Sequence, residues 1–333
     1  MTASATALPL HGMRVRKIIV LFAAALLLAS TARDAAGAET VRVGKSSDIS
    51  FTFVPVDVGI HEKFFQKAGI EVEVASFGGS AKLQQALVAG AVDAGLAAGT
   101  DIPFLVKGAP EIGVGAIALT PALFGVILPY DSPVHKLSDL KGKKIGVTTV
   151  GSLTEWLALQ IVKKEGWKRE DLTIVADGSS GAAEIAALRT GAVDARISAA
   201  ALGIDLEQRQ QGRLLMPVSE FVGPFLMNVI YVTKDMAEKR PDAVRAFLKG
   251  WYEAVGFMFD HKAEANAIAQ TVTHFAPSVQ EKQYDLVMPS MSRDGTFPAD
   301  AVATVEQSFT DLGLLTEKPD MTKYLTTRFL PQR

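Results

Sequence analysis

The sequence predicts an α/β protein built from two similar lobes, because one strand, polar loop, helix and strand pattern occurs twice. The two copies run over residues 77–94 and 177–195, and both end in Gly-Ala-Val-Asp-Ala. In each copy an amphipathic stretch follows a small-residue turn and is closed by a glycine, Gly90 or Gly191, as a helix typically is. The likeness extends upstream to a preceding strand and helix, so the chain reads as one α/β half used twice.

Length and composition limit the classes of function. With 333 residues and 48% hydrophobic content, the chain can bury two ordinary cores. Its formal net charge of -2 excludes a bulk attraction to nucleic acid or to a membrane surface. The chain has no cysteine, which excludes disulfides, thiolate metal sites, a cysteine nucleophile and a lipid-modified N-terminus.

The N-terminal segment resembles a secretory signal peptide. Basic residues gather over 14–17, an unbroken apolar run covers 18–28, and a small-residue cleavage motif ends at Ala38. The apolar run falls short of the ~20 residues that span a bilayer, so a membrane anchor is the weaker interpretation. We therefore expect export and a mature chain that begins near Glu39, whether translation starts at the first methionine or at Met13.

In the first part of the mature chain, strands and helices are expected to alternate. The first strand leads into a long polar and aromatic loop, Lys45–Phe53, and then into a helix after Pro55. That helix is expected to continue through Phe64 and to stop at Gly69. The first crossing between the lobes is placed around Pro121. The strands expected here are 41–44, 70–75, a short segment after Asp93, and 112–119.

The middle of the chain repeats this pattern, and the end is mostly helical. After a strand at 124–128 and the second copy of the repeat, a helix is expected over 199–211. Residues 221–225 are interpreted as the return crossing, before a strand at 229–233. A long helix from Pro241 should bury an apolar stripe, and the C-terminal tail should pack back on the first lobe. The stripe consists of Val244, Phe247, Leu248, Trp251, Val255 and Met258.

The motifs of several enzyme classes are incomplete or absent. Residues 113–118 match a dinucleotide-binding pattern, but Pro121 spoils the helix that should follow, so we expect a strand with small residues. Residues 146–152 have the glycine spacing of a P-loop, but Ser152 stands where that motif needs its lysine. No histidine pair has metal-ligand spacing and no G-x-S-x-G elbow is present, although a dispersed triad stays open. We expect no cofactor and no metal.

Polar loops are predicted where strands end and helices begin, which is the usual ligand edge of an α/β sheet. Helix-start N–H groups, with the hydroxyls of Ser80, Ser152 and Thr154, suit an anionic or strongly polar group. The same residues would also serve as ordinary helix caps. The loops are 47–50, 78–80, 150–154 and 178–180. The carboxylates that would instead receive an amine are Asp48, Asp101 and Asp177.

Several stretches carry a family resemblance. They are Gly59–Gly69, Gly78–Ser80, Ala86–Leu87 with Gly90 and Asp93, Asp139–Val147, Gly151–Ser152, Gly191–Ala195, Val232–Ala237, Arg240–Leu248 and Tyr324–Phe329. On these stretches the chain resembles the periplasmic solute-binding proteins of bacterial ABC importers, of the taurine, alkanesulfonate and nitrate type. That type shares its domain with thiamine-pyrimidine precursor binding proteins. The resemblance covers nearly all of the mature chain.

The resemblance implies a type II periplasmic-binding-protein fold, with a ligand cleft between two α/β lobes and two hinge crossings. Its parts would be a signal peptide at 1–38, lobe I at 39–122, lobe II at 123–225, and the second part of lobe I with C-terminal helices at 226–333. Carried over by position, the ligand-binding residues would be Asp48, Ser50, Phe51, Gly79, Ser80, Gly99, Thr100, Gly151, Ser152, Thr154, Ser198 and Asn228.

The resemblance also implies the partners: a small-molecule ligand and an inner-membrane ABC permease with its ATPase, but no nucleic acid. The protein would be a periplasmic monomer. Residues 198–202 replace an aromatic and a proline that taurine binders often have, so the identity of the ligand stays open. Two other classes stay open as well. One is an enzyme on the same fold, of the pyrimidine or menaquinone precursor type, which the leader disfavours; the other is an exported ligand-sensing domain.

Overall fold

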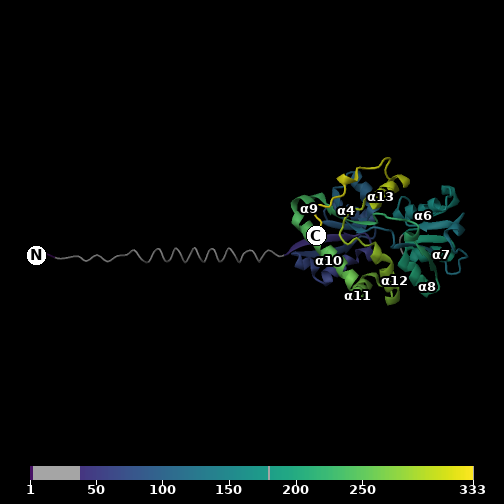
Figure 1. Ribbon diagram of the computed structural model, residues 1–333, viewed down its shortest axis with the longest axis horizontal. Helices are drawn as coiled ribbons and strands as arrows, with labels where there is room; N and C mark the ends of the chain where they lie inside the picture. The colour runs from purple at the N-terminus through teal and green to yellow at the C-terminus, as the bar shows by residue number, and fades with distance from the viewer. Residues whose placement is uncertain (3–37, 179–180, 333) are drawn as a thin grey trace. The chain divides into compact units, whose positions relative to one another are not determined.

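The computed structural model describes residues 1–2, 38–178 and 181–332 (Figure 1). The predicted signal peptide lies almost wholly outside these residues, and so do the last two residues of the polar loop at 178–180. Residues from Thr40 onward form one compact unit. This unit contains two five-stranded sheets, which confirms the predicted α/β class. Among the described residues, no helix is both long and apolar enough to cross a membrane.

The first sheet has the strand order β2-β1-β3-β10-β4. β1 runs parallel to β3, whereas β10 pairs antiparallel with both β3 and β4. The strands are β1 Glu39–Lys45, β2 Ile70–Ser76, β3 Ala94–Ala98, β4 Glu111–Ala118 and β10 Asn228–Thr233. The sheet thus takes one strand from the later part of the chain, and the segment predicted as a strand with small residues is β4.

The second sheet has the equivalent order β7-β6-β8-β5-β9. β6 lies between two parallel neighbours, while β5 pairs antiparallel with β8 and β9. The strands are β5 Phe124–Leu128, β6 Lys144–Val147, β7 Thr173–Ala176, β8 Ala195–Ala199 and β9 Arg213–Pro217. The order matches the first sheet strand for strand, with β5 in the place of β10, so the internal duplication read from the sequence is present in the topology.

The repeated Val-Asp-Ala motif has the same structural task in both sheets. The Asp93 carboxylate accepts the backbone N–H of Arg42 in β1 at 2.9 Å. The Asp194 carboxylate accepts the backbone N–H of Lys144 in β6 at 2.8 Å. Each aspartate therefore ties the entry of the lobe's third strand to its first strand, and neither lies in a predicted ligand loop.

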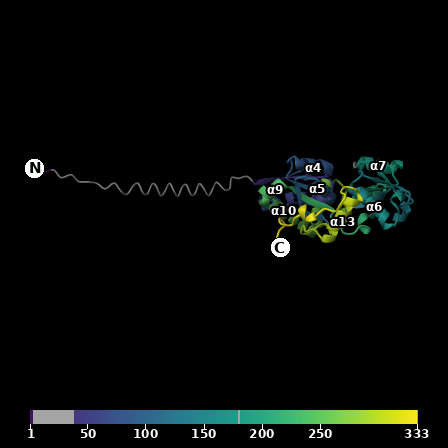
Figure 2. The ribbon, with the colours of Figure 1, turned by 90° about the horizontal axis from the view of Figure 1, so that it is seen from above.

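Helices cover both sheets (Figures 1 and 2). In the first lobe α4 lies on one side of the sheet and α10 on the other, and in the second lobe α6, α7 and α8 surround the strands. The helices are α2 Val54–His61, α3 Phe64–Lys67, α4 Ser80–Val88, α5 Ile102–Val106, α6 Leu153–Lys164, α7 Gly181–Thr190, α8 Ala200–Gln208, α9 Lys234–Lys239, α10 Pro241–Asp260, α11 Lys262–Thr273, α12 Pro277–Val287 and α13 Ala299–Asp311. Short 3-10 turns include η1 Phe51–Phe53 and η2 Gly99–Asp101.

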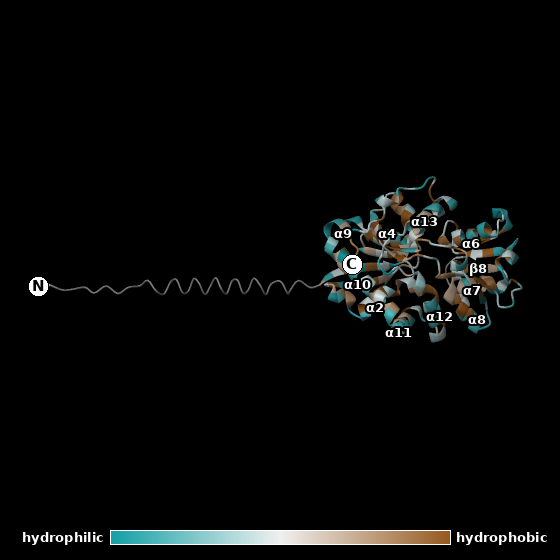
Figure 3. Cartoon of the chain, viewed as in Figure 1, coloured by the Kyte–Doolittle hydropathy of each residue, from teal (hydrophilic) through white to brown (hydrophobic). Residues whose placement is uncertain are grey.

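Helix α10 is a central element of the first lobe and packs mainly against the neighbouring helices α2 and α3. All six residues of the predicted apolar stripe are fully buried, so this prediction is confirmed. Figure 3 shows apolar residues along the strands and hydrophilic residues on outer helices such as α9 and α11. The tail also returns to this lobe as predicted, because the Thr326 N–H donates to the Gly113 carbonyl at 2.9 Å and Phe329 is buried.

The single helix predicted from Pro55 to Gly69 is instead two, α2 and α3. The break lies at Lys63, whose φ of 61° is left-handed. The turn places the Phe65 ring flat against Phe247 of α10, at 5.4 Å between centroids. A continuous helix would have carried that ring elsewhere, so burial of an aromatic side chain outweighs the local cost of the left-handed residue.

Candidate functional site

Three polar loops begin at one edge of the first sheet. The Ser46 N–H donates to the carbonyl of Leu96 in β3 at 3.0 Å, and the Phe77 N–H donates to the carbonyl of Lys45 at 3.0 Å. The loops after β1, β2 and β3 therefore start side by side. In α/β sheets this carboxyl edge is the usual place for a ligand.

Asn228 belongs to the same edge, because it opens the antiparallel strand β10 opposite Ala98. Its amide nitrogen donates to the Ala97 carbonyl at 3.3 Å. Its side-chain oxygen is buried and has no hydrogen-bond partner within the described part of the chain. Asn228 thus brings an unused acceptor to this edge.

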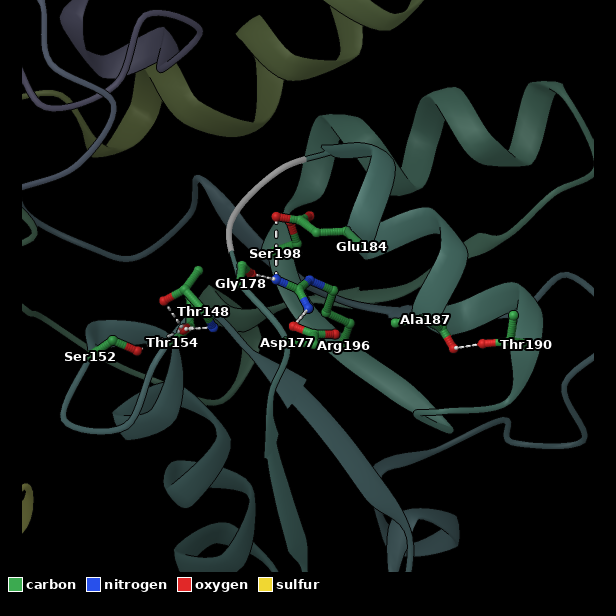
Figure 4. A network of polar contacts seen from close by, with 10 residues as sticks. All are labelled: Thr148, Ser152, Thr154, Asp177, Gly178, Glu184, Ala187, Thr190, Arg196 and Ser198. Atoms are coloured by element: carbon green, nitrogen blue, oxygen red, sulfur yellow. Dashed lines mark hydrogen bonds and ion pairs between the residues drawn. The ribbon is translucent and has the colours of Figure 1, made fainter.

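The second sheet presents an equivalent edge (Figure 4). The Asp177 N–H donates to the Val147 carbonyl at 3.1 Å, and the Gly178 N–H donates to the Thr148 carbonyl at 3.2 Å. The loops after β6 and β7 therefore also run side by side. The hydroxyls of Thr148 and Ser152 each lie 2.9 Å from the Thr154 hydroxyl, which forms a small cluster at the start of α6.

Helix α13 connects the two edges on one flank. It packs against η2, where a β-carbon on Gly99 would lie 3.2 Å from Val305. At its other end, the Asp311 carboxylate accepts the indole N–H of Trp156 in α6 at 3.0 Å. The loop at 99–101 and the start of α6 are thus held by one helix.

Helix α12 connects the same edges on the other flank. Tyr284 packs edge-on against Phe51 of η1, with ring centroids 6.1 Å apart. Val279 is buried against Ala201 and Ile204 of α8, the helix that follows β8. With α12 and α13 on either side, the two loop-bearing edges are brought toward each other.

The predicted residues of the first lobe differ in what they can offer a ligand. Asp48 is exposed and accepts the N–H of Ile49, while the Ser50 hydroxyl is buried 2.9 Å from the Thr52 hydroxyl. Phe51 is fully buried in the core, and Gly99 and Thr100 of the following turn are buried as well. None of these three residues presents an exposed surface to a ligand. Ser80 is half-buried in the first turn of α4, after Gly79 with its φ of 143°.

The predicted residues of the second lobe are largely engaged within the protein. Ser152 caps α6 by accepting the Glu155 N–H at 3.3 Å, so the capping interpretation holds for it. The Gly151 N–H donates to the Glu155 carboxylate at 2.7 Å. The Thr154 hydroxyl accepts the Thr148 N–H at 2.9 Å, and the Ser198 hydroxyl donates to Glu184 at 2.5 Å.

Gly99 lies where two segments of the backbone approach each other closely, so this position requires a glycine. A β-carbon there would lie 2.0 Å from the Leu226 carbonyl oxygen, and a backbone atom cannot move aside. We therefore expect Gly99→Ala to destabilise the protein by about 1–3 kcal/mol through overpacking, as measured by urea unfolding. Gly223→Ala is the matched control, because nothing lies within 4 Å of a β-carbon there. Equal stability of the two variants would contradict this role.

A buried ion cluster in the second lobe was not predicted as such (Figure 4). Arg196 of β8 is fully buried; it pairs with Asp177, donates to the Gly178 carbonyl at 2.5 Å and lies 3.3 Å from Glu184. Burial lowers the pKa of Arg196 to about 10 and raises the pKa of Glu184. Because Asp177 is paired with this guanidinium, its carboxylate is less suited to receive a ligand amine.

A second unpredicted cluster lies in the first lobe, where Glu111 faces Gln84 of α4. Asp101 and Glu111 are both buried, and burial raises the pKa of each to about 7. The sequence named Asp101 only as a possible partner for an amine. The sequence did contain an indication that Arg196 is unusual. The first copy of the repeat has Gly95 at the position where the second copy has this arginine. Glu111 lies outside both copies of the repeat, so the comparison of the copies gave no such indication for it.

No group of three or more histidine, aspartate or glutamate side chains within the described ranges is arranged to hold a metal ion. The polar atoms at the two edges are backbone N–H groups, hydroxyls and amides. Such atoms hold small polar or anionic groups by hydrogen bonds.

Comparisons with known proteins show which family the chain resembles. The family model described as NMT1/THI5 like matches residues 50–265. A Bacillus subtilis (strain 168) protein named for binding aliphatic sulfonates is 27% identical over 263 residues, which cover 74% of this chain and 75% of that protein. The taurine-binding periplasmic protein of Escherichia coli (strain K12) is 30% identical over 195 residues, covering 57% of this chain and 58% of that protein.

A solved structure shares the architecture. The alkanesulfonate-binding protein SsuA from Xanthomonas axonopodis pv. citri, bound to MOPS, aligns over 88% of this chain and 99% of its own, with a TM-score of 0.72 and 21% identity. The likeness shows that the fold is that of the periplasmic binding proteins, as predicted.

Proposed function

Because the chain belongs to the NMT1/THI5-like family, we propose that it is the solute-binding component of an ABC importer. It captures a small polar or anionic organic solute between its two lobes in the periplasm and delivers it to a membrane permease with its ATPase. Sulfonates are the leading ligand class, because the relatives found are named for aliphatic sulfonates, taurine and alkanesulfonate. Nitrate and related oxyanions follow.

One observation carries this proposal. Two topologically equivalent sheets place polar loops on their carboxyl edges, and α12 and α13 tie those edges together. Binding between two lobes that can move relative to each other suits capture and release. We propose boundaries at 38/39, 122/123 and 225/226, and the last two lie in the segments that connect the sheets.

The buried cations near the two edges are matched by carboxylates within the protein. Lys45 donates to Asp57 at 2.5 Å, and Arg196 is paired with Asp177, so these charges are internally matched. We propose that the ligand is therefore held by neutral polar groups, with partial positive charge from the helix N-termini. Within the proposed site, we propose the half-buried Ser80 at the start of α4 as a direct ligand contact, with the other predicted residues shaping the loops.

A binding assay tests the proposal. The mature chain from Glu39 is titrated calorimetrically with ethanesulfonate, taurine and nitrate, and we expect saturable binding to one site. A ligand at about 100 times its dissociation constant should add about 2.7 kcal/mol to the free energy of unfolding. Ser80→Ala should weaken binding by about 10-fold to 100-fold, the loss of one hydrogen bond to a charged group.

Ser132→Ala is the control, because Ser132 lies in a loop away from both edges and its hydroxyl accepts only the Val134 N–H, at 3.4 Å. Binding that Ser80→Ala leaves unchanged would remove this residue from the site. No binding across the panel would contradict the proposed ligand class, and chemical conversion of a bound compound would support an enzyme instead.

A further inference from the structure

Three hydroxyl groups at the edge of the second sheet form one hydrogen-bonded row (Figure 4). The Thr154 hydroxyl lies 2.9 Å from the Thr148 hydroxyl on one side and 2.9 Å from the Ser152 hydroxyl on the other. We call this row the hydroxyl relay. Thr154 in its middle is 4% exposed, whereas Thr148 and Ser152 at its ends are half-buried. Solvent therefore reaches the ends of the relay but hardly its middle.

The relay holds one proton more than its internal contacts use. Each hydroxyl brings one proton and two lone pairs, so three protons are available for two oxygen–oxygen contacts. The other groups bound to the relay are donors: the Thr148 N–H donates to Thr154 at 2.9 Å, and the Glu155 N–H donates to Ser152 at 3.3 Å. These groups use lone pairs and accept no proton. Among the described residues no further acceptor is hydrogen-bonded to the relay, so one hydroxyl proton is unmatched.

The unmatched proton lies at one end of the relay or at the other. If Ser152 donates to Thr154, Thr154 donates to Thr148 and the Thr148 proton is unmatched. If Thr148 donates to Thr154 instead, Thr154 donates to Ser152 and the Ser152 proton is unmatched. The buried middle does not carry it, because two hydroxyl donors and the Thr148 N–H would exceed the two lone pairs of Thr154.

The first lobe contains a shorter version of this arrangement. Ser50 and Thr52 follow β1 as Ser152 and Thr154 follow β6, and their hydroxyls also lie 2.9 Å apart. Two hydroxyl protons and one contact leave one proton unmatched here too. The internal duplication thus brings an unmatched hydroxyl donor to the equivalent loop of each lobe.

We propose that Thr148 is a further ligand contact, and that Thr148 and Ser152 serve one acceptor group of the ligand interchangeably, with Thr154 as the positioning residue between them. Water accepts the unmatched proton while the site is open. When water is expelled the ligand must accept it, because a buried donor without a partner is costly. This inference rests on the function proposed above. It narrows the ligand class to solutes with several oxygen acceptors on the bound group, such as sulfonates, because an ammonium group offers only further donors.

Single and double variants test the interchange. Thr148→Val and Ser152→Ala each leave the other end of the relay able to carry the unmatched proton. Each should therefore weaken ethanesulfonate binding by only about twofold, the loss of one of two arrangements. The double variant Thr148→Val/Ser152→Ala removes both ends and should weaken binding by about 10-fold to 100-fold. Calorimetric titration of the mature chain measures all three affinities.

Thr149→Val is the matched control, because Thr149 is exposed in the same loop and its hydroxyl takes no part in the relay. Its affinity should equal that of the wild type, and so should that of Thr148→Ser, which keeps the hydroxyl. The proposal is overturned if the double variant loses no more than the product of the two single losses. It is also overturned if Thr149→Val weakens binding as much as the double variant does.

A measurement without ligand separates the relay from the proposed function. Thr154→Val removes the acceptor of the Thr148 N–H and both hydroxyl contacts, so the melting temperature should fall by about 2–6 °C. Thr154→Ser keeps the oxygen and should recover most of this loss. Equal melting temperatures of these two variants overturn the relay whatever binds.

The two failures are distinguishable. If ethanesulfonate, taurine and nitrate all fail to bind to the wild type, the proposed ligand class fails and the proposed contact fails with it, even where Thr154→Ser recovers stability. If one of them binds and the double variant loses nothing beyond the single variants, this inference alone fails.

Discussion

The double variant Asp101→Asn/Glu111→Gln is expected to unfold at a clearly higher temperature than the wild type at about pH 8.5, and at nearly the same temperature at about pH 4. Burial raises the folded-state pKa of both carboxyls to about 7, above their ordinary values of 3.8 and 4.5. Between these values the folded state binds more protons than the unfolded one. Stability is therefore lost as pH rises through this window, and the loss is complete above pH 7.

The size of the effect follows from the shifts. At about 1.4 kcal/mol per pKa unit, each buried carboxyl costs on the order of 3 kcal/mol when ionised, less whatever the two share by coupling. The amides of the variant keep the shape and remove the charge. Thermal unfolding followed by circular dichroism at several pH values measures the difference.

Asp131→Asn is the control for this series, because Asp131 is an exposed loop carboxylate. It should leave the melting temperature unchanged at both pH values. A double variant that is no more stable than the wild type at alkaline pH would show that the two carboxyls are not buried in the folded protein.

Arg196→Met should destabilise the protein by about 3–5 kcal/mol at neutral pH, because the loss of one partner leaves buried carboxylates uncompensated. Arg196 is fully buried, and Asp177 and Glu184 face it at 13% and 8% side-chain exposure. Methionine replaces the length of the side chain but none of its charge or donors. For a chain of this size we expect the melting temperature to fall by ~10 °C.

Two comparisons identify the cause. Arg189→Met changes an exposed arginine of α7 and should have little effect. The triple variant Arg196→Met/Asp177→Asn/Glu184→Gln removes the unpaired charges and should recover most of the loss. If the triple variant were as unstable as Arg196→Met alone, side-chain packing rather than charge would explain the defect.

The repeat could be predicted from the sequence because it consists of local sequence patterns. Gly90 and Gly191 end equivalent helices, and Asp93 and Asp194 hold equivalent strand starts. Such features depend on residues a few positions away or on the register of one sheet. They therefore produce patterns that recur in the sequence. The apolar stripe of α10 was predictable for the same reason.

The candidate site was predictable as a set of loops but not as a set of contacts. The hydroxyl of Ser152 was predicted from the loop pattern and Ser198 from the family resemblance, whereas in the structure the first caps α6 and the second donates to Glu184. Whether a hydroxyl is free or engaged depends on side chains that lie far away in sequence. A local sequence pattern does not show which distant side chains these are.

The sequence by itself thus determined the α/β class, the internal duplication and the edges on which the polar loops would lie, because hydrophobic periodicity and turn residues encode those features locally. Only the tertiary structure decided which charges are matched. Gln84 contacts Glu111 across 27 positions of sequence, and Arg196 contacts Asp177 across 19. These pairings depend on strand order and helix packing, which bring distant residues together. Burial raises the pKa of an ordinary carboxyl only once the whole lobe has folded around it.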